Sequence, residues 1–111
     1  MSLLGFFARW RQEPRLVELG DSIAAESLES VWPLVGHRVG ELSTHELVGH
    51  VRARSRGLVS EKVQRVAETH GSGIAQHTEA LIEQSTNALV KLVVTRYRQS
   101  TERQVMRRRA A

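Results

Sequence analysis

Two long stretches with helical periodicity, separated by Gly71-Ser72-Gly73, restrict what this chain can fold into. Before the glycines, apolar side chains recur at steps of three and four, at Val48, Val51, Val59, Val63 and Val66. After the glycines the same steps continue through Ile74, Leu81, Leu89 and Val93. This period is typical of an α-helix with one buried face. A short glycine link between two such helices predicts an antiparallel hairpin of about 43–70 and 73–108.

The start of the first long helix is the clearest local signal, in the sequence LSTHEL at 42–47. The Ser43 hydroxyl can accept a hydrogen bond from the amide three residues on, and Glu46 can bond back to the Ser43 amide. Leu42 and Leu47 have the spacing of the apolar pair that flanks such a cap. The sequence therefore predicts a helix that begins directly after Ser43.

The first third of the chain predicts another helix, at about 14–31, beginning with Pro14 and interrupted by Pro33. Its apolar positions, Leu16, Leu19, Ile23 and Val31, again lie on one face. The expected fold class is all-α: a small helical bundle, built on the long hairpin, with the N-terminal helix packed against it. We expect one domain over 1–111, with an amphipathic N-terminal segment at 1–12 and a basic helical extension at 97–111.

The last helix carries a second apolar stripe, formed by Val90, Val94 and Tyr97, opposite its main apolar face. A helix that is apolar on two faces has to be covered on two faces. The N-terminal segment places aromatic and aliphatic side chains at helical spacing, at Leu3, Phe6, Phe7 and Trp10. These seven residues are the predicted protein interface. Burial of the same residues within the fold is an open alternative, and so is binding of the N-terminal segment to a membrane surface.

Charge is unevenly distributed in this chain, whose net charge is +4. The segment 12–30 is acidic, whereas arginines dominate 95–111. The two blocks can attract each other within one chain or between two chains. Arginine also attracts phosphate, so binding to nucleic acid is an alternative. The residues expected to make such contacts are Arg52, Arg56, Arg103, Arg107, Arg108 and Arg109.

Residues 49–68 partly resemble a helix-turn-helix motif, with Ala53, Gly57 and Leu58 at the small, turn and apolar positions. Arg52 and Arg56, however, stand where the motif needs apolar side chains facing the core. Burying two unpaired guanidinium groups costs several kcal/mol. The apolar stripe that continues past Gly57 instead favours one uninterrupted helix.

No pattern in the sequence predicts catalysis. The chain has no cysteine, which excludes thiol chemistry and zinc sites with cysteine ligands. In HELVGH at 45–50 the two histidines are five residues apart, or about 140° around a helix, so they cannot readily share one ion. We therefore expect no enzyme activity, no metal or other cofactor and no small-molecule substrate.

The N-terminal residues lack the leading charge and the cleavage site of a signal peptide, so the expected location is the cytoplasm. The leading functional hypothesis is a helical interaction or assembly protein, either homo-oligomeric or a subunit of a larger complex. Nucleic-acid binding is the alternative, and peripheral membrane association is the third.

Overall fold

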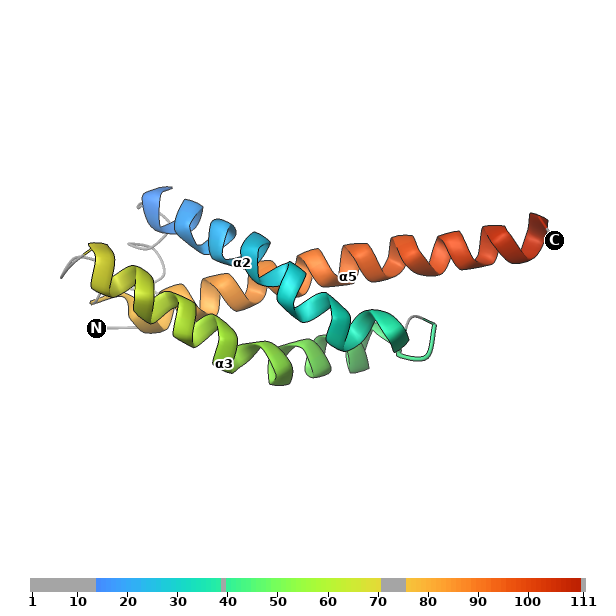
Figure 1. The fold of residues 1–111 in the computed structure, drawn as a ribbon, viewed down its shortest axis with the longest axis horizontal. Helices are drawn as coiled ribbons and strands as arrows, with labels where there is room; N and C mark the ends of the chain where they lie inside the picture. Colours follow the sequence, from blue (N-terminus) through green and yellow to red (C-terminus); the bar gives the residue numbers. More distant parts are fainter. Residues whose placement is uncertain (1–13, 39, 71–75, 111) are drawn as a thin grey trace.

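The computed structural model describes residues 14–38, 40–70 and 76–110. Within these ranges the chain forms three α-helices, α2 (Pro14–Val35), α3 (Thr44–His70) and α5 (Thr78–Ala110). A short 3₁₀ helix, η1 (Gly36–Arg38), follows α2, and the described residues include no strand. The three long helices pack against one another (Figure 1), which confirms the predicted all-α bundle. The amphipathic segment 1–12, with Leu3, Phe6, Phe7 and Trp10, lies outside the described residues.

The long hairpin formed by α3 and α5 is antiparallel, as the sequence predicts. The Tyr97 hydroxyl of α5 meets Leu42 just before α3, and Arg52 of α3 bonds to Asn87 in the first third of α5. Helix α2 runs in the same direction as α5, because Gly20 lies beside Gln84 and Glu29 pairs with Arg96. Helix α5 thus contacts both α2 and α3.

Two helices cover α5, which explains why its apolar residues extend around so much of its surface. Leu81 and Val90 are both buried, although nine residues along an α-helix place them about 180° apart. Leu89, Val93 and Tyr97 complete the buried arc. The second apolar stripe of α5 is therefore covered within a single chain.

The start of α3 has the predicted cap. The Glu46 amide donates to Ser43 Oγ at 3.2 Å, and the Ser43 amide donates to Glu46 Oε1 at 3.1 Å. These hydrogen bonds satisfy two of the amides that have no partner at a helix start. Leu42 packs against the core cluster that includes Leu47, as the flanking apolar pair requires.

Two boundaries differ from the prediction. Helix α2 continues through Pro33 to Val35, because a proline in the last turn removes only one hydrogen bond of a helix that is about to end. Helix α5 begins at Thr78, five residues after the expected start near 73. Its first turn carries Glu79, a favourable charge at that end of the helix dipole, whereas the expected start contains glycine.

The helix-turn-helix alternative is wrong, since residues 49–68 all belong to the uninterrupted helix α3. Gly57 is exposed in the middle of this helix, and a Cβ atom built there would meet no atom within 4 Å. The glycine is therefore tolerated on the solvent side and does not make a turn.

Candidate functional site: an arginine-lined groove between α2 and α5

The predicted interface residues of α5 are largely covered by the chain itself. Val90 and Tyr97 are 7% and 6% exposed, and Val94 is half-buried against the core. The Tyr97 hydroxyl donates to the Arg38 carbonyl at 2.7 Å and accepts from the Leu42 amide at 3.0 Å. Val90 and Tyr97 therefore offer little area to a partner, whereas Val94 is partly accessible.

The six arginines predicted to contact nucleic acid do not form one surface. Arg52 lies on the bundle, where its Nη2 donates to Asn87 Oδ1 at 2.7 Å and its Nη1 lies 3.9 Å from Glu83. Arg56 is exposed one turn further along α3. Twenty residues of helix, or about 30 Å, separate Asn87 from Arg107 on α5. Arg52 and Arg56 are thus remote from the four arginines at the end of the chain.

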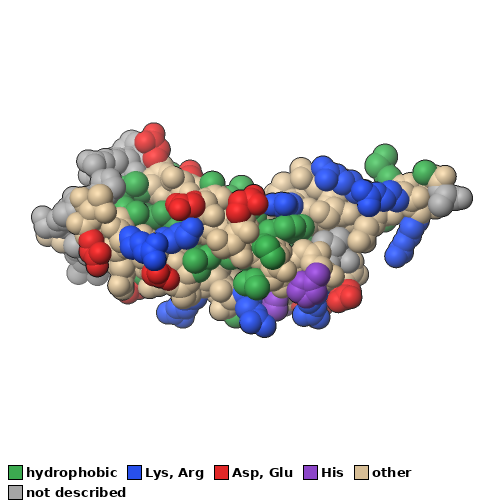
Figure 2. Space-filling view, in the orientation of Figure 1, with side chains coloured by type: hydrophobic (Ala, Val, Ile, Leu, Met, Phe, Trp, Pro, Cys, Tyr) green, Lys and Arg blue, Asp and Glu red, His purple; other side chains and the backbone are tan. Residues whose placement is uncertain are grey.

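The end of α5 extends past the rest of the bundle. Residues 102–110, which we call the projecting end, are all exposed, and Figure 1 shows that α5 continues beyond the ends of α2 and α3. The projecting end carries Arg103, Arg107, Arg108 and Arg109 against one acidic residue, Glu102. Among the described residues, no carboxylate lies within 4.0 Å of these arginines. In Figure 2 the projecting end accordingly shows blue side chains, whereas the red ones lie over the bundle.

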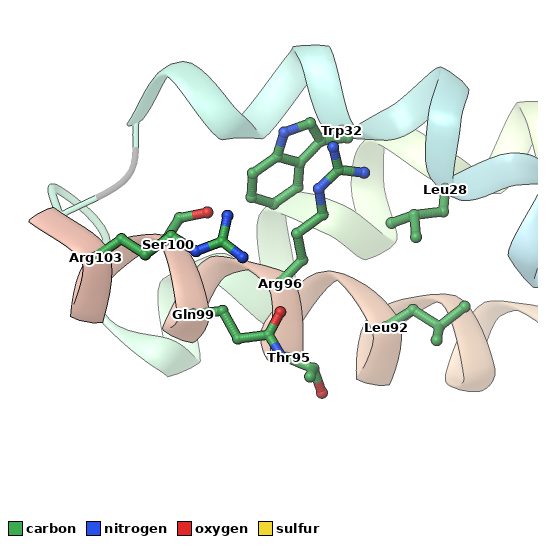
Figure 3. A pocket seen from close by; sticks show the side chains of 8 residues that line it. All are labelled: Leu28, Trp32, Leu92, Thr95, Arg96, Gln99, Ser100 and Arg103. Atoms are coloured by element: carbon green, nitrogen blue, oxygen red, sulfur yellow. The ribbon is translucent and has the colours of Figure 1, made fainter.

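A groove between α2 and α5 leads from the bundle to the projecting end. Its central hollow has a volume of about 420 Å³. The hollow is lined by Leu28, Trp32, Leu92, Thr95, Arg96, Gln99, Ser100 and Arg103, which Figure 3 labels. A second hollow of about 230 Å³ continues it, where Gly36, Gln104 and Arg107 join Trp32, Ser100 and Arg103. Arg103 and Arg107 of the predicted set therefore line the groove.

Arg96 and Trp32 form the fixed part of this groove. The Arg96 guanidinium carbon lies 4.6 Å from the centroid of the Trp32 ring, and its Nη1 lies 3.4 Å from Glu29 Oε1. Behind the indole, a Cβ atom at Gly36 would lie only 2.7 Å from Trp32 Cε2. Glycine at this position lets the indole of Trp32 lie against the start of η1.

Trp32 and Arg96 are not among the site residues predicted from the sequence. One signal was present, since Arg96, Arg103 and Arg107 recur on one face of a helix at steps of seven and four. The partner of that face was not predictable, because Trp32 belongs to a helix that lies far away in the sequence.

Chemically, the groove can bind anions and apolar side chains. Two guanidinium groups and a hydroxyl face its central hollow, and neither hollow is lined by a carboxylate. In the described part of the chain, no three histidine or acidic side chains gather as metal ligands. None of the described helices has a stretch long and apolar enough to cross a bilayer.

Comparison with known proteins adds no relative. No protein-family model, no curated protein sequence and no solved structure matches this chain.

Proposed function

We propose that this chain is a non-enzymatic helical interaction protein that assembles with an acidic partner through the projecting end of α5. The observation that carries the proposal is the exposure of every residue from 102 to 110, with four arginines against one glutamate. An isolated helix of this length is marginal in water. A partner that supplies carboxylates would stabilise it through charge-assisted hydrogen bonds, for which arginine is well suited.

A second copy of the chain has the required acidic surface. Glu18, Asp21, Glu26 and Glu29 are all exposed on α2. Among the described residues, only Glu29 of these four pairs with an arginine, and Glu26 lies 3.6 Å from Lys62. The projecting end points away from the N-terminal half of its own α2 (Figure 1), so its arginines are placed to meet the acidic residues of another chain. We therefore propose a homo-oligomer as the simplest assembly.

Light scattering after size exclusion tests this proposal. The native chain should have a mass above that of the monomer at low salt, and the double substitution Arg108→Ala with Arg109→Ala should shift it toward the monomer. The control, Arg54→Ala with Arg56→Ala, removes the same charge from exposed residues of α3 that also have no carboxylate within 4.0 Å in the described structure. A native chain that is monomeric throughout, or equal loss of mass in the two variants, would contradict self-assembly by the projecting end.

Nucleic-acid binding is the second candidate, and one observation favours it. At 100° per residue, Arg103, Arg108 and Arg109 point in three different directions around the projecting end. Only Val105 and Met106 are large exposed apolar side chains there. Arginines that point outward in several directions suit a polyanion that surrounds the helix better than they suit a partner with one flat apolar surface.

Fluorescence anisotropy with a labelled DNA duplex tests the second candidate. Affinity should fall steeply as salt is raised, because each neutralised phosphate releases counterions. Arg108→Ala with Arg109→Ala should lower the steepness of that dependence by up to about two units of the logarithmic slope. Absence of binding at low salt would dispose of this candidate and leave the assembly proposal intact.

A further inference from the structure

The groove between α2 and α5 is longer than its central hollow. A third hollow of about 430 Å³ lies between the N-terminal half of α2 and α5, and it shares Leu92 with the central one. The three hollows therefore follow one another along the same pair of helices. From Gln84 to Arg107 the groove covers twenty-three residues of α5, or about 35 Å.

The two ends of this groove differ in chemistry. At one end Ala25, Ala88, Leu28 and Leu92 supply aliphatic surface, beside the polar side chains of Asp21, Gln84, Asn87 and Lys91. Leu92 is 38% exposed although it is a large apolar side chain. Arginines supply the other end. A ligand that fills the groove therefore needs apolar groups at the aliphatic end and acidic groups at the arginine end.

Arg96 is held in place before any partner binds. Its guanidinium stacks on Trp32 and pairs with Glu29, so little of its conformational entropy is left to lose. Figure 3 shows the Arg103 side chain reaching into the hollow from one turn beyond Ser100, toward Trp32 and Arg96. The two guanidinium groups thus face the same space, where they can bind one acidic group between them.

We infer that this groove binds an acidic peptide segment of another protein, with aliphatic side chains seated at Leu28 and Leu92 and carboxylates at Arg96 and Arg103. The inference rests on the proposed function only in treating the chain as an interaction protein, and it adds a second partner to self-assembly. A nucleic-acid strand fits less well, because it repeats phosphates along its length and has no aliphatic groups for the end at Ala88 and Leu92. A peptide can be apolar at one end and acidic at the other.

The test is a titration of the full chain with a labelled 15-residue peptide that carries leucines in one half and glutamates in the other. A second peptide has serine in place of each leucine, and a single-stranded DNA of 15 nucleotides is the third probe. Binding is measured by fluorescence anisotropy. We expect the leucine peptide to bind about tenfold more tightly than the serine peptide, since its leucines bury apolar area.

Variants locate the site. Arg103→Ala should weaken binding of the leucine peptide about tenfold, as loss of a charge-assisted hydrogen bond does. Leu92→Ser, at the other end of the groove, should remove most of the preference for leucine over serine. Arg54→Ala, which removes an exposed arginine of α3, should leave both affinities unchanged. Arg103, Leu92 and Arg54 are all exposed, so circular dichroism should show the same helix content for each variant.

Three outcomes would overturn the inference: equal affinity for the leucine and serine peptides, equal weakening by Arg103→Ala and Arg54→Ala, or DNA binding as tight as that of the leucine peptide. None of them bears on the mass of the native chain. A native chain that assembles but shows one of these outcomes keeps the proposed function and loses the peptide site. A native chain that is monomeric but binds the leucine peptide as expected keeps the peptide site and loses the proposed self-assembly.

Discussion

Tyr97 joins the last helix to the turn between the first two through hydrogen bonds. Its hydroxyl donates to the Arg38 carbonyl and accepts from the Leu42 amide, while its ring is buried in the core. The turn itself depends on Gly40, whose φ of +88° is rarely adopted by residues with a side chain. A buried hydroxyl and a glycine in the left-handed region together fix the path from α2 to α3.

We predict that Tyr97→Phe lowers the free energy of unfolding by about 1–3 kcal/mol, because it leaves partly buried backbone groups of the turn without their partner. Urea denaturation followed by circular dichroism measures the change. The control is Thr95→Val on the same helix, where the lost hydroxyl is exposed and bonds only to the Lys91 carbonyl at 2.9 Å. Equal effects of the two substitutions would mean that the turn contributes nothing through Tyr97.

The cap of α3 makes a prediction about pH. The Ser43 amide, and then its hydroxyl, hold the pKa of the Glu46 carboxyl below its ordinary value of 4.5. A lowered folded-state pKa means that the carboxylate stabilises the fold above pH 4.5 and that this contribution is lost as pH falls through the folded-state value.

Glu46→Gln should therefore be less stable than the native chain at neutral pH, and the difference should shrink as the solution is acidified below about pH 4.5. Urea denaturation at a series of pH values measures it. Glu68→Gln, an exposed carboxylate of the same helix with no hydrogen-bond partner among the described residues, is the control. A difference that stays constant with pH would show that the charge of Glu46 has no part in the cap.

At the scale of elements, two glycines inside helices have opposite roles. Gly57 in α3 faces solvent with nothing near a built Cβ atom, whereas at Gly20 in α2 a Cβ atom would lie 2.6 Å from Gln84 Cγ of α5. Gly20 thus lets two helices approach closely, while Gly57 only lowers the helix propensity of α3.

Alanine at these positions should shift stability in opposite directions. Gly57→Ala should raise the free energy of unfolding by about 0.5–1 kcal/mol through helix propensity alone. Gly20→Ala gains the same propensity but forces α2 away from α5, and overpacking of this kind typically costs about 1–3 kcal/mol. Thermal unfolding compares the two variants with the native chain. Stabilisation by Gly20→Ala would show that Gln84 moves aside at little cost.

At the scale of the whole molecule, the chain is elongated because one helix is longer than its neighbours. The Cα radius of gyration is 16.3 Å, against about 13 Å for a compact chain of this length. The principal extents of 57 × 26 × 21 Å follow the axis of α5. The last buried residue of α5 is Tyr97, so the projecting end adds length without adding core.

Removal of residues 102–111 should therefore leave the free energy of unfolding of the bundle, measured by urea denaturation, unchanged within about 0.5 kcal/mol. The shortened chain should still lose any assembly that depends on the projecting end, which separates folding from function in one variant. A large loss of stability would show that the projecting end supports the bundle, and the assembly proposal would then lack its main observation.

Several features of this fold depend on interactions between residues that are close together in the sequence, and the sequence alone predicts them. The cap at Ser43 and Glu46 joins residues three positions apart, and the apolar steps of α3 and α5 each lie within one helix. Helical hydrogen bonds also join near neighbours in the sequence. For this reason the helix class, the hairpin of α3 and α5 and the solvent position of Gly57 follow from the sequence without knowledge of the rest of the fold.

Only the tertiary structure decided how the second apolar stripe of α5 is covered and where the groove lies. Val90 and Tyr97 are compatible with a partner chain or with this chain's own helices, and the packing of α2 and α3 selects the latter. Likewise, Trp32 and Arg96 meet only because α2 runs alongside α5. Such contacts depend on which distant faces bury the most apolar surface together, and that is a property of the whole chain, which no local pattern contains.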